Sequence, residues 1–200
     1  MSRHFTDQHE LIQYVWDFLR ERCASLQKDV NHCLNGMFAP FPAILYCFST
    51  IDLLGALYVG NAKSGCPTTK QSADYMQRFM NYTQQQAELL QQLFRHKLVH
   101  AAQPRAVVKY SGKVVSWGYE HDNRAKHLLL EDLPTGRKVT ITPTWGISCD
   151  QIFWLSILDF ARDVCESVEW PGGYLSTLER TPDLQDHFER ALTHLFDPSQ

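Results

Sequence analysis

The stretch AILYCFSTIDLLGALYV, residues 43–59, is the most apolar part of this 200-residue chain and decides the fold class. Its apolar side chains fall on most faces of a helix, and two prolines just before it suit a helix start. The run is shorter than the roughly 20 apolar residues of a membrane span, and it contains Ser49, Thr50 and Asp52. We therefore predict a buried helix in the middle of a helical bundle, with no membrane contact.

Helical periodicity extends over much of the remaining chain. Thr83 followed by Gln86 is a capping-box pattern that begins one helix, and Pro104 ends it near Ala102. Ser148 with Gln151 is a similar pattern, and it is expected to begin a later helix. The predicted helices are at about 6–36, 40–59, 70–81, 83–102, 148–170 and from Thr181 onward.

Two segments between these helices have the alternating pattern of strands. Residues 106–119 alternate around a Ser-Gly pair that suits a tight turn, and residues 127–142 suggest a second hairpin. The sequence therefore predicts a mainly α, up-and-down helical bundle formed by one domain, residues 1–200. A small antiparallel β-hairpin insert is expected at about 105–142, between the fourth helix and the C-terminal helices.

Charge is unevenly distributed along a chain whose net charge is only −3. The balance argues against a generally basic nucleic-acid-binding protein. However, residues 63–113 contain eight lysines and arginines against two acidic residues, whereas residues 149–200 contain three arginines against ten acidic residues. The basic segment is either solvated surface or a local site for a polyanion.

The six cysteines include no closely spaced pair of the kind that forms a zinc ribbon or a redox motif. The N-terminal residues are polar and do not resemble a signal peptide. Together these features predict reduced cysteines and a cytoplasmic protein.

The strongest candidate for a functional site lies in ELLQQLFRHKLVHAAQP, residues 88–104. Arg95 is followed by the polar His96 and, after a spacing of four residues, by His100, all in one core helix inside the basic segment. This arrangement resembles the Arg-x4–6-His signature of the HEPN superfamily of helical domains. The resemblance covers roughly residues 6–102 and the later helices, and leaves the β insert outside.

The resemblance implies a metal-independent endoribonuclease with a role in defence or toxin systems, acting on RNA without a cofactor. It also implies a homodimer whose interface forms a composite site from Arg95, His96 and His100, and an antitoxin or regulatory partner is conceivable. Histidine can exchange protons near neutral pH, and arginine holds phosphate oxygens. In a regular helix Arg95 and His100 lie about 140° apart and do not stack, so either the long arginine stem reaches toward the histidines or, as the resemblance implies, a second copy supplies the partner residue.

Three alternatives remain open for these side chains. They can simply offset the dipole at a helix end, or serve a non-catalytic HEPN-like binding or interaction module. His96 and His100 also have the spacing of metal ligands in a metal-dependent protein. Asp52 either orients Arg95 or caps a neighbouring helix, and the sequence favours the second role.

Overall fold

The computed structural model describes residues 5, 7–36, 38–134, 138–142 and 145–196. The N-terminal half contains α1 (Gln8–Asn35), α2 (Pro40–Val59), α3 (Thr68–Phe79), α4 (Gln84–Leu89), the π-helical segment η1 (Leu90–Arg95) and α5 (His96–Ala101). The strands are β1 (Val108–Tyr110), β2 (Lys113–Glu120), β3 (Leu130–Asp132), β4 (Lys138–Thr142), β5 (Trp145–Ser148) and β6 (Gln151–Ser156), with a 3-10 turn η2 (Arg124–Lys126) before β3. The chain then forms α6 (Ile157–Glu169), α7 (Tyr174–Leu178) and α8 (Pro182–Phe196).

Helix α2 is the central helix of the protein, as its sequence predicts. It is long and apolar enough to cross a membrane by length and composition, but more than half of it is buried inside the protein. Helices α1, α3, α6 and α8 pack against it. The burial identifies α2 as a core helix of a mainly helical fold.

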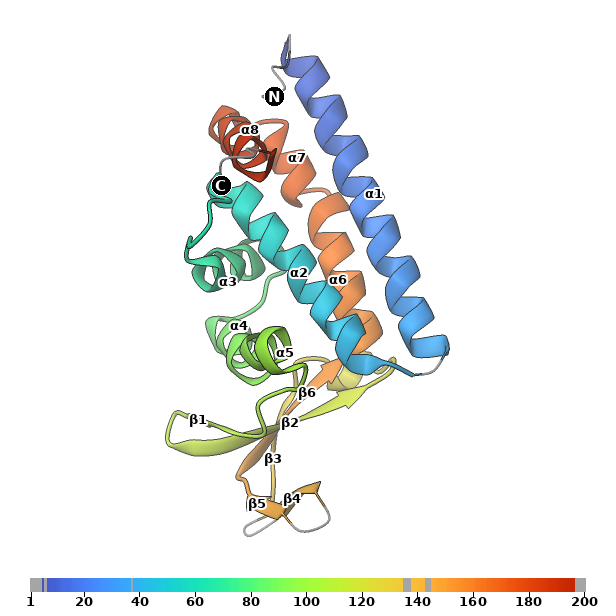
Figure 1. The fold of residues 1–200 in the computed structure, drawn as a ribbon, viewed down its shortest axis with the longest axis vertical. Helices are drawn as coiled ribbons and strands as arrows, with labels where there is room; N and C mark the ends of the chain where they lie inside the picture. Colours follow the sequence, from blue (N-terminus) through green and yellow to red (C-terminus); the bar gives the residue numbers. More distant parts are fainter. Residues whose placement is uncertain (1–4, 6, 37, 135–137, 143–144, 197–200) are drawn as a thin grey trace.

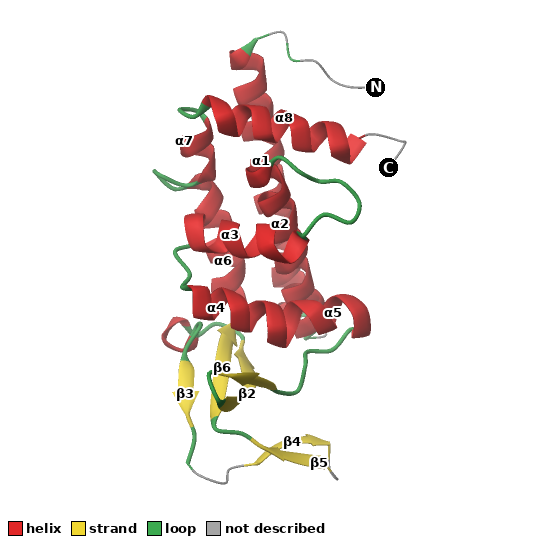
Figure 2. Cartoon of the chain, turned by 90° about the vertical axis from the view of Figure 1, so that its left-hand side faces the viewer, coloured by secondary structure: helices red, strands yellow, loops and turns green. Residues whose placement is uncertain are grey.

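The helices do not form the predicted up-and-down bundle. Figure 1 shows α1, α2 and α6 running along the length of the molecule, whereas α3, α4–α5 and α8 lie across them. In the orthogonal view of Figure 2, α4 and α5 follow one another across the molecule between the long helices and the sheet. Helical periodicity reports which face of a helix is buried, and it does not report the angle at which two helices cross.

Several predicted boundaries are confirmed. Thr83 and Gln86 form the reciprocal capping box at the start of α4. Ser111 and Gly112 both have positive φ, 48° and 80°, as the tight turn between β1 and β2 requires. The last helix begins at Pro182.

Of the two predicted antiparallel hairpins, the first forms as β1–β2, but the second does not form, and the sheet is mixed. The order of the four-stranded sheet is β1-β2-β6-β3, and β2 pairs with β6 in parallel. Strand β3 pairs with β6 rather than with β4, and β4 pairs with β5 in a separate two-stranded sheet. The β region therefore extends beyond residue 142 to Ser156, and β6, one of the two inner strands of the sheet, comes from the segment that was predicted to be helical.

The helix predicted from Ser148 begins only at Ile157, after β6. The run IFWLSIL is apolar except for Ser156, which suits a strand buried on both faces as well as a buried helix. All but one of the residues of β6 are buried, since β2 and β3 flank it on either side. Pairing with distant strands decides the outcome, and local periodicity does not contain that information.

Candidate functional site

The side chain of Arg95 is anchored in a fixed position by three helices. Its Nε donates to Oδ1 and Oδ2 of Asp52 at 2.9 and 3.0 Å, and its Nη2 donates to Oδ2 at 2.8 Å. Its Nη1 donates to Thr69 Oγ1 at 3.0 Å. Only 12% of the Arg95 side chain and 21% of the Asp52 side chain are exposed. This bidentate pair fixes both the position and the plane of the guanidinium group.

A close approach of α2 to α3 positions the carboxylate. A Cβ on Gly55 would lie 2.8 Å from the backbone of Gln71 and 2.9 Å from the amide nitrogen of Ser72, so only glycine fits at this crossing. Asp52 lies one turn before Gly55, and its Oδ1 is in hydrogen-bond contact with the hydroxyl of the buried Ser72. The structure therefore gives Asp52 the role that the sequence disfavoured: it orients Arg95.

The sequence suggests a regular α-helix around Arg95, but the helix that carries this residue is irregular. Residues Leu90–Arg95 form a π-helical segment, and the backbone N–H of His96 donates to the carbonyl of Gln91. Such segments are rare and are often found at functional sites. The Gln91 side chain is buried within this segment, and its amide atoms have no hydrogen-bond partner among the described residues.

His96 and His100 lie in α5 with exposed side chains, one turn apart on one face of the helix. The pKa of His96 is lowered below its ordinary value by partial burial and then by the charges of Arg95, His100 and Arg105, against a weaker opposite effect from Asp52. Arg105 is close because its backbone N–H donates to the carbonyl of Leu93 at 2.6 Å, which folds the chain back onto the helix. His96 is therefore favoured in its neutral form.

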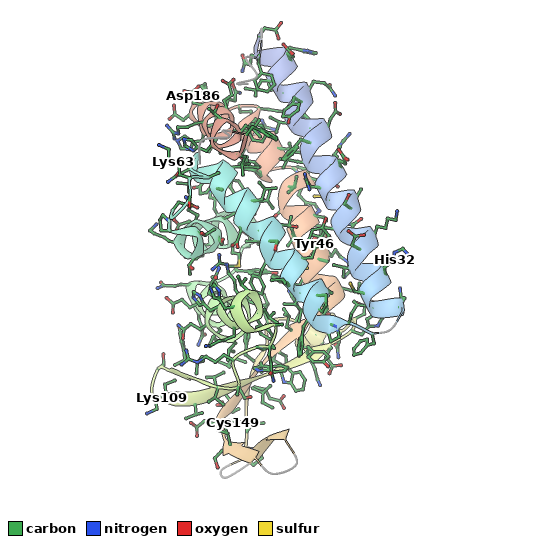
Figure 3. All side chains as sticks on the ribbon, in the orientation of Figure 1. His32, Tyr46, Lys63, Lys109, Cys149 and Asp186 are labelled. Carbon is green, nitrogen blue, oxygen red and sulfur yellow. The ribbon has the colours of Figure 1, made fainter. Side chains whose placement is uncertain are left out.

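Exposed cations surround this site. Lys97 and Arg105 are exposed, and Val99, which is 48% exposed, is an apolar side chain on the same short helix. Figure 3 shows the basic segment along one long edge of the molecule, from Lys63 after α2 to Lys109 on the β1–β2 hairpin. Asp52 is held by Arg95, so the open surface around the histidines is basic.

The structure brings Arg95 together with Asp52, but it does not join Arg95 to the histidines by a hydrogen bond within the described chain. No group of three His, Cys, Asp or Glu side chains that could hold a metal ion is found in the described part of the chain. His96 and His100 thus lack a third ligand from these residues. The chemistry that remains is a fixed cation beside two exposed imidazoles.

A second polar cluster lies at the other end of the same helix, and no sequence motif predicts a site there. Asp163 Oδ2 accepts hydrogen bonds from Tyr82 Oη at 2.8 Å and from His127 Nε2 at 3.1 Å, and its Oδ1 accepts from Arg124 Nη1. Tyr82 Oη and His127 Nε2 are themselves 3.1 Å apart. Tyr82 and Asp163 are buried, whereas most of the Arg124 side chain is exposed.

The pKa values in this cluster reflect its hydrogen bonds. Burial acts to raise the pKa of Asp163, but the hydrogen bonds from His127 and Arg124 outweigh it and hold the pKa below the ordinary value. Burial, followed by the neighbouring carboxylate, raises the pKa of Tyr82, so its hydroxyl stays protonated and donates. The cluster thus contains an ionised carboxylate satisfied by three donors.

Sequence reasoning missed this cluster because its members are far apart in the chain. Tyr82 precedes α4, Arg124 begins η2, His127 follows it, and Asp163 lies in α6. Asp163 is 36 to 81 positions from the three residues that donate to it, so no local spacing pattern links them. Comparisons of the chain with known protein families, with curated proteins and with solved structures give no match.

Proposed function

We propose that the protein is a metal-independent endoribonuclease of HEPN type, with Arg95, His96 and His100 in a composite site at a homodimer interface. The observation that supports this most is the anchored guanidinium of Arg95 beside two exposed imidazoles in a basic surface. The Arg-x4-His spacing supports it from the sequence.

Arg95 is suited to hold a phosphate, because its contacts with Asp52 and Thr69 do not use all of its N–H donors. A guanidinium has five N–H groups, and the contacts with Asp52 and Thr69 use one each on Nε, Nη1 and Nη2. One N–H on each terminal nitrogen remains available. Two such donors match two oxygens of a phosphodiester, and they would stabilise the charge that develops there during cleavage.

The histidines would move the protons. A neutral imidazole takes the proton from a ribose 2′-hydroxyl, and the 2′-oxygen then attacks phosphorus and displaces the 5′-oxygen of the next nucleotide. An imidazolium returns a proton to that leaving oxygen, which leaves a 2′,3′-cyclic phosphate and a 5′-hydroxyl end. The lowered pKa of His96 suits the role of base, and the proposal then assigns the role of acid to His100.

A second copy of the chain would complete the site. His100 is exposed and is not hydrogen-bonded to Arg95 within one described chain, and the exposed Val99 between them supplies an apolar contact for a symmetric neighbour. A two-fold axis beside α5 would place each His100 near the Arg95 of the other copy. Light scattering should therefore give a dimer at micromolar concentration, and a monomer would contradict the composite site.

The test of catalysis is cleavage of a mixed RNA pool in the presence of a strong chelator. His100→Ala should remove most activity, because general acid–base catalysis is typically worth about 10²–10⁴-fold. The exposed His121 offers a matched control, and His121→Ala should cleave like wild type. Arg95→Ala is a poorer probe, because it also leaves the partly buried Asp52 without its partner.

The non-catalytic alternative makes a distinct prediction. If Arg95 serves only to satisfy Asp52, the wild-type protein will leave RNA intact at high enzyme concentration, and His100→Ala will change neither cleavage nor stability. Activity that is abolished by chelation and restored by zinc would instead favour a metal-dependent enzyme.

A further inference from the structure

A polar cleft of about 500 Å³ lies over the Tyr82–His127–Asp163 cluster. Its walls come from the end of α3 and the start of α4, from η2, and from the last two turns of α6 with the loop that follows. The volume falls in the range of small-molecule sites, about 300–1,000 Å³. The cleft is distinct from the proposed RNA-cleaving site, because it contains none of Arg95, His96 and His100.

One wall of the cleft is a single face of α6. Asp163, Glu166 and Trp170 follow one another at helical spacing, so they lie on the same side of the helix. Trp170 is the residue before Pro171 and leaves the helical conformation with ψ 152°, and its side chain is 62% exposed. An indole at the mouth of a polar cleft is a flat apolar surface on which an aromatic ring can stack.

The charged groups of the cleft divide into paired and unpaired ones. Asp163 is satisfied by Tyr82, His127 and Arg124. Among the residues that the structure describes, the carboxylate of Glu166 forms no hydrogen bond or ion pair, and the exposed Arg78 forms no ion pair, although its guanidinium lies over the ring of Phe79, 5.7 Å from the centroid. An unpaired acid and an unpaired guanidinium on the two walls suit a ligand that has both donors and an anionic group.

Two further features point to a ligand. Arg124 uses Nη1 for Asp163, so N–H groups on its other nitrogens remain available on a side chain that is mostly exposed. His127 lines the cleft, and its Nδ1 is buried without a hydrogen-bond partner in the described chain. Buried polar atoms without partners are rare, and they are often found where function requires them.

We infer that this cleft binds a guanine nucleotide. The ring would stack on Trp170, and Arg78 with Arg124 would hold the phosphate. The Watson–Crick edge of guanine presents two adjacent N–H donors to the carboxylate of Glu166, which accepts both. Adenine places a ring acceptor beside its single amino group, so its edge would bring a lone pair against the same carboxylate.

The experiment is a titration of the full chain with 5′-GMP, followed by the tryptophan indole N–H signals in NMR. The chain has five tryptophans, and GMP should shift the indole signal of Trp170, assigned by its loss in Trp170→Phe, in a saturable way. AMP, guanosine and inorganic phosphate are the comparison probes. Each should bind more weakly than GMP, because AMP lacks the guanine edge, guanosine lacks the phosphate, and inorganic phosphate lacks both the ring and its edge.

Substitutions of Trp170, Glu166 and Arg78 test the stacking, base-recognition and phosphate contacts one at a time. Trp170→Ala should weaken GMP binding by roughly tenfold or more, as expected for the loss of a stacking platform. Glu166→Gln should reduce the preference for GMP over AMP, whereas Glu169→Gln, an exposed acid on the same helix outside the cleft, should leave both unchanged. Arg78→Ala should weaken GMP binding but leave guanosine binding unchanged, since guanosine has no phosphate.

A final competition experiment distinguishes whether the guanine belongs to an RNA strand or to a free nucleotide. A short RNA with one guanosine that competes with GMP, while the same RNA without guanosine does not, would assign the cleft to an RNA strand. An RNA that never competes would assign it to a free nucleotide. Absence of saturable GMP binding at millimolar concentration, equal affinities for GMP and AMP, or unchanged binding by Trp170→Ala would each overturn the inference.

Discussion

Replacing Asp52 with asparagine tests the contact on which the candidate site depends. The substitution keeps the shape of the side chain and removes its charge, so the guanidinium of Arg95 would remain in place without a counter-ion. Three of the four hydrogen bonds that Arg95 donates go to this carboxylate. The fourth goes to Thr69, which is neutral and cannot compensate the charge.

The magnitude follows from the burial of the pair. Removing one partner of a fully buried ion pair costs about 3–5 kcal/mol. Arg95 and Asp52 retain 12% and 21% exposure, so some solvent screening remains, and the expected loss is about 2–4 kcal/mol. For a chain of this length each kcal/mol lowers the melting temperature by roughly 2–4 °C, so Asp52→Asn should melt about 5–15 °C below wild type.

The assay is chemical and thermal unfolding of wild type, Asp52→Asn and a matched control. Asp74→Asn removes the acid of an ion pair with Lys70 whose side chains are 38% and 74% exposed, and it should cost at most about 0.5 kcal/mol. A double-mutant cycle with Arg95→Ala should give a coupling free energy above about 1 kcal/mol. If Asp52→Asn is as stable as Asp74→Asn, the pair does not anchor Arg95 and the reasoning about the site fails.

Three further predictions concern single groups. Gly55→Ala should lower the free energy of unfolding by about 1–3 kcal/mol, because its Cβ would meet backbone atoms of α3 at 2.8–2.9 Å; denaturant unfolding that shows no loss contradicts the tight crossing. The imidazole of His96 should titrate below the ordinary histidine pKa when it is followed by NMR. The free energy of unfolding should fall as the pH drops from the unfolded-state pKa through that lowered value, because the unfolded chain binds the proton more readily. The Asp163 carboxylate should stabilise the fold above the ordinary aspartate pKa, and this stabilisation should be lost as the pH falls through its lower folded pKa. The melting temperature of Asp163→Asn should therefore depend less on pH than that of wild type between about pH 2 and 5.

The features predicted correctly are those encoded within a few neighbouring residues. The capping box needs only Thr83 and Gln86, and the first hairpin turn needs only Ser111 and Gly112. Strand β6 shows the opposite case, since its apolar run has no local feature that excludes a helix. A Ser-x-x-Asp pattern does occur at Ser156, immediately before the true start of α6, but the Ser156 hydroxyl donates to Asp159 and does not cap a backbone N–H of the helix.

The candidate site was predictable in part for the same reason. Arg95, His96 and His100 lie in one short motif, whereas the contact between Arg95 and Asp52 depends on a helix crossing that Gly55 permits. A glycine one turn after an acid in an apolar helix is a weak signal by itself. Recognising it would have required knowing which helix crosses there, and that is a property of the fold as a whole.

The two polar clusters also explain why the helix between them departs from regular geometry. Tyr82, just before α4, is bonded to Asp163 of α6, and Arg95, at the end of η1, is bonded to Asp52 of α2. These anchors are roughly 20 Å apart at 1.5 Å per residue, and each fixes the rotation of the helix about its axis. The π-helical segment lies between the two anchors and widens one turn, which changes the rotation of the helix about its axis. A regular helix would have to meet the rotations required by both anchors without such a change. The side-chain amide of Gln91 in the same segment has no hydrogen-bond partner among the described residues, which destabilises the fold, and the hydrogen bonds at the two anchors offset this loss.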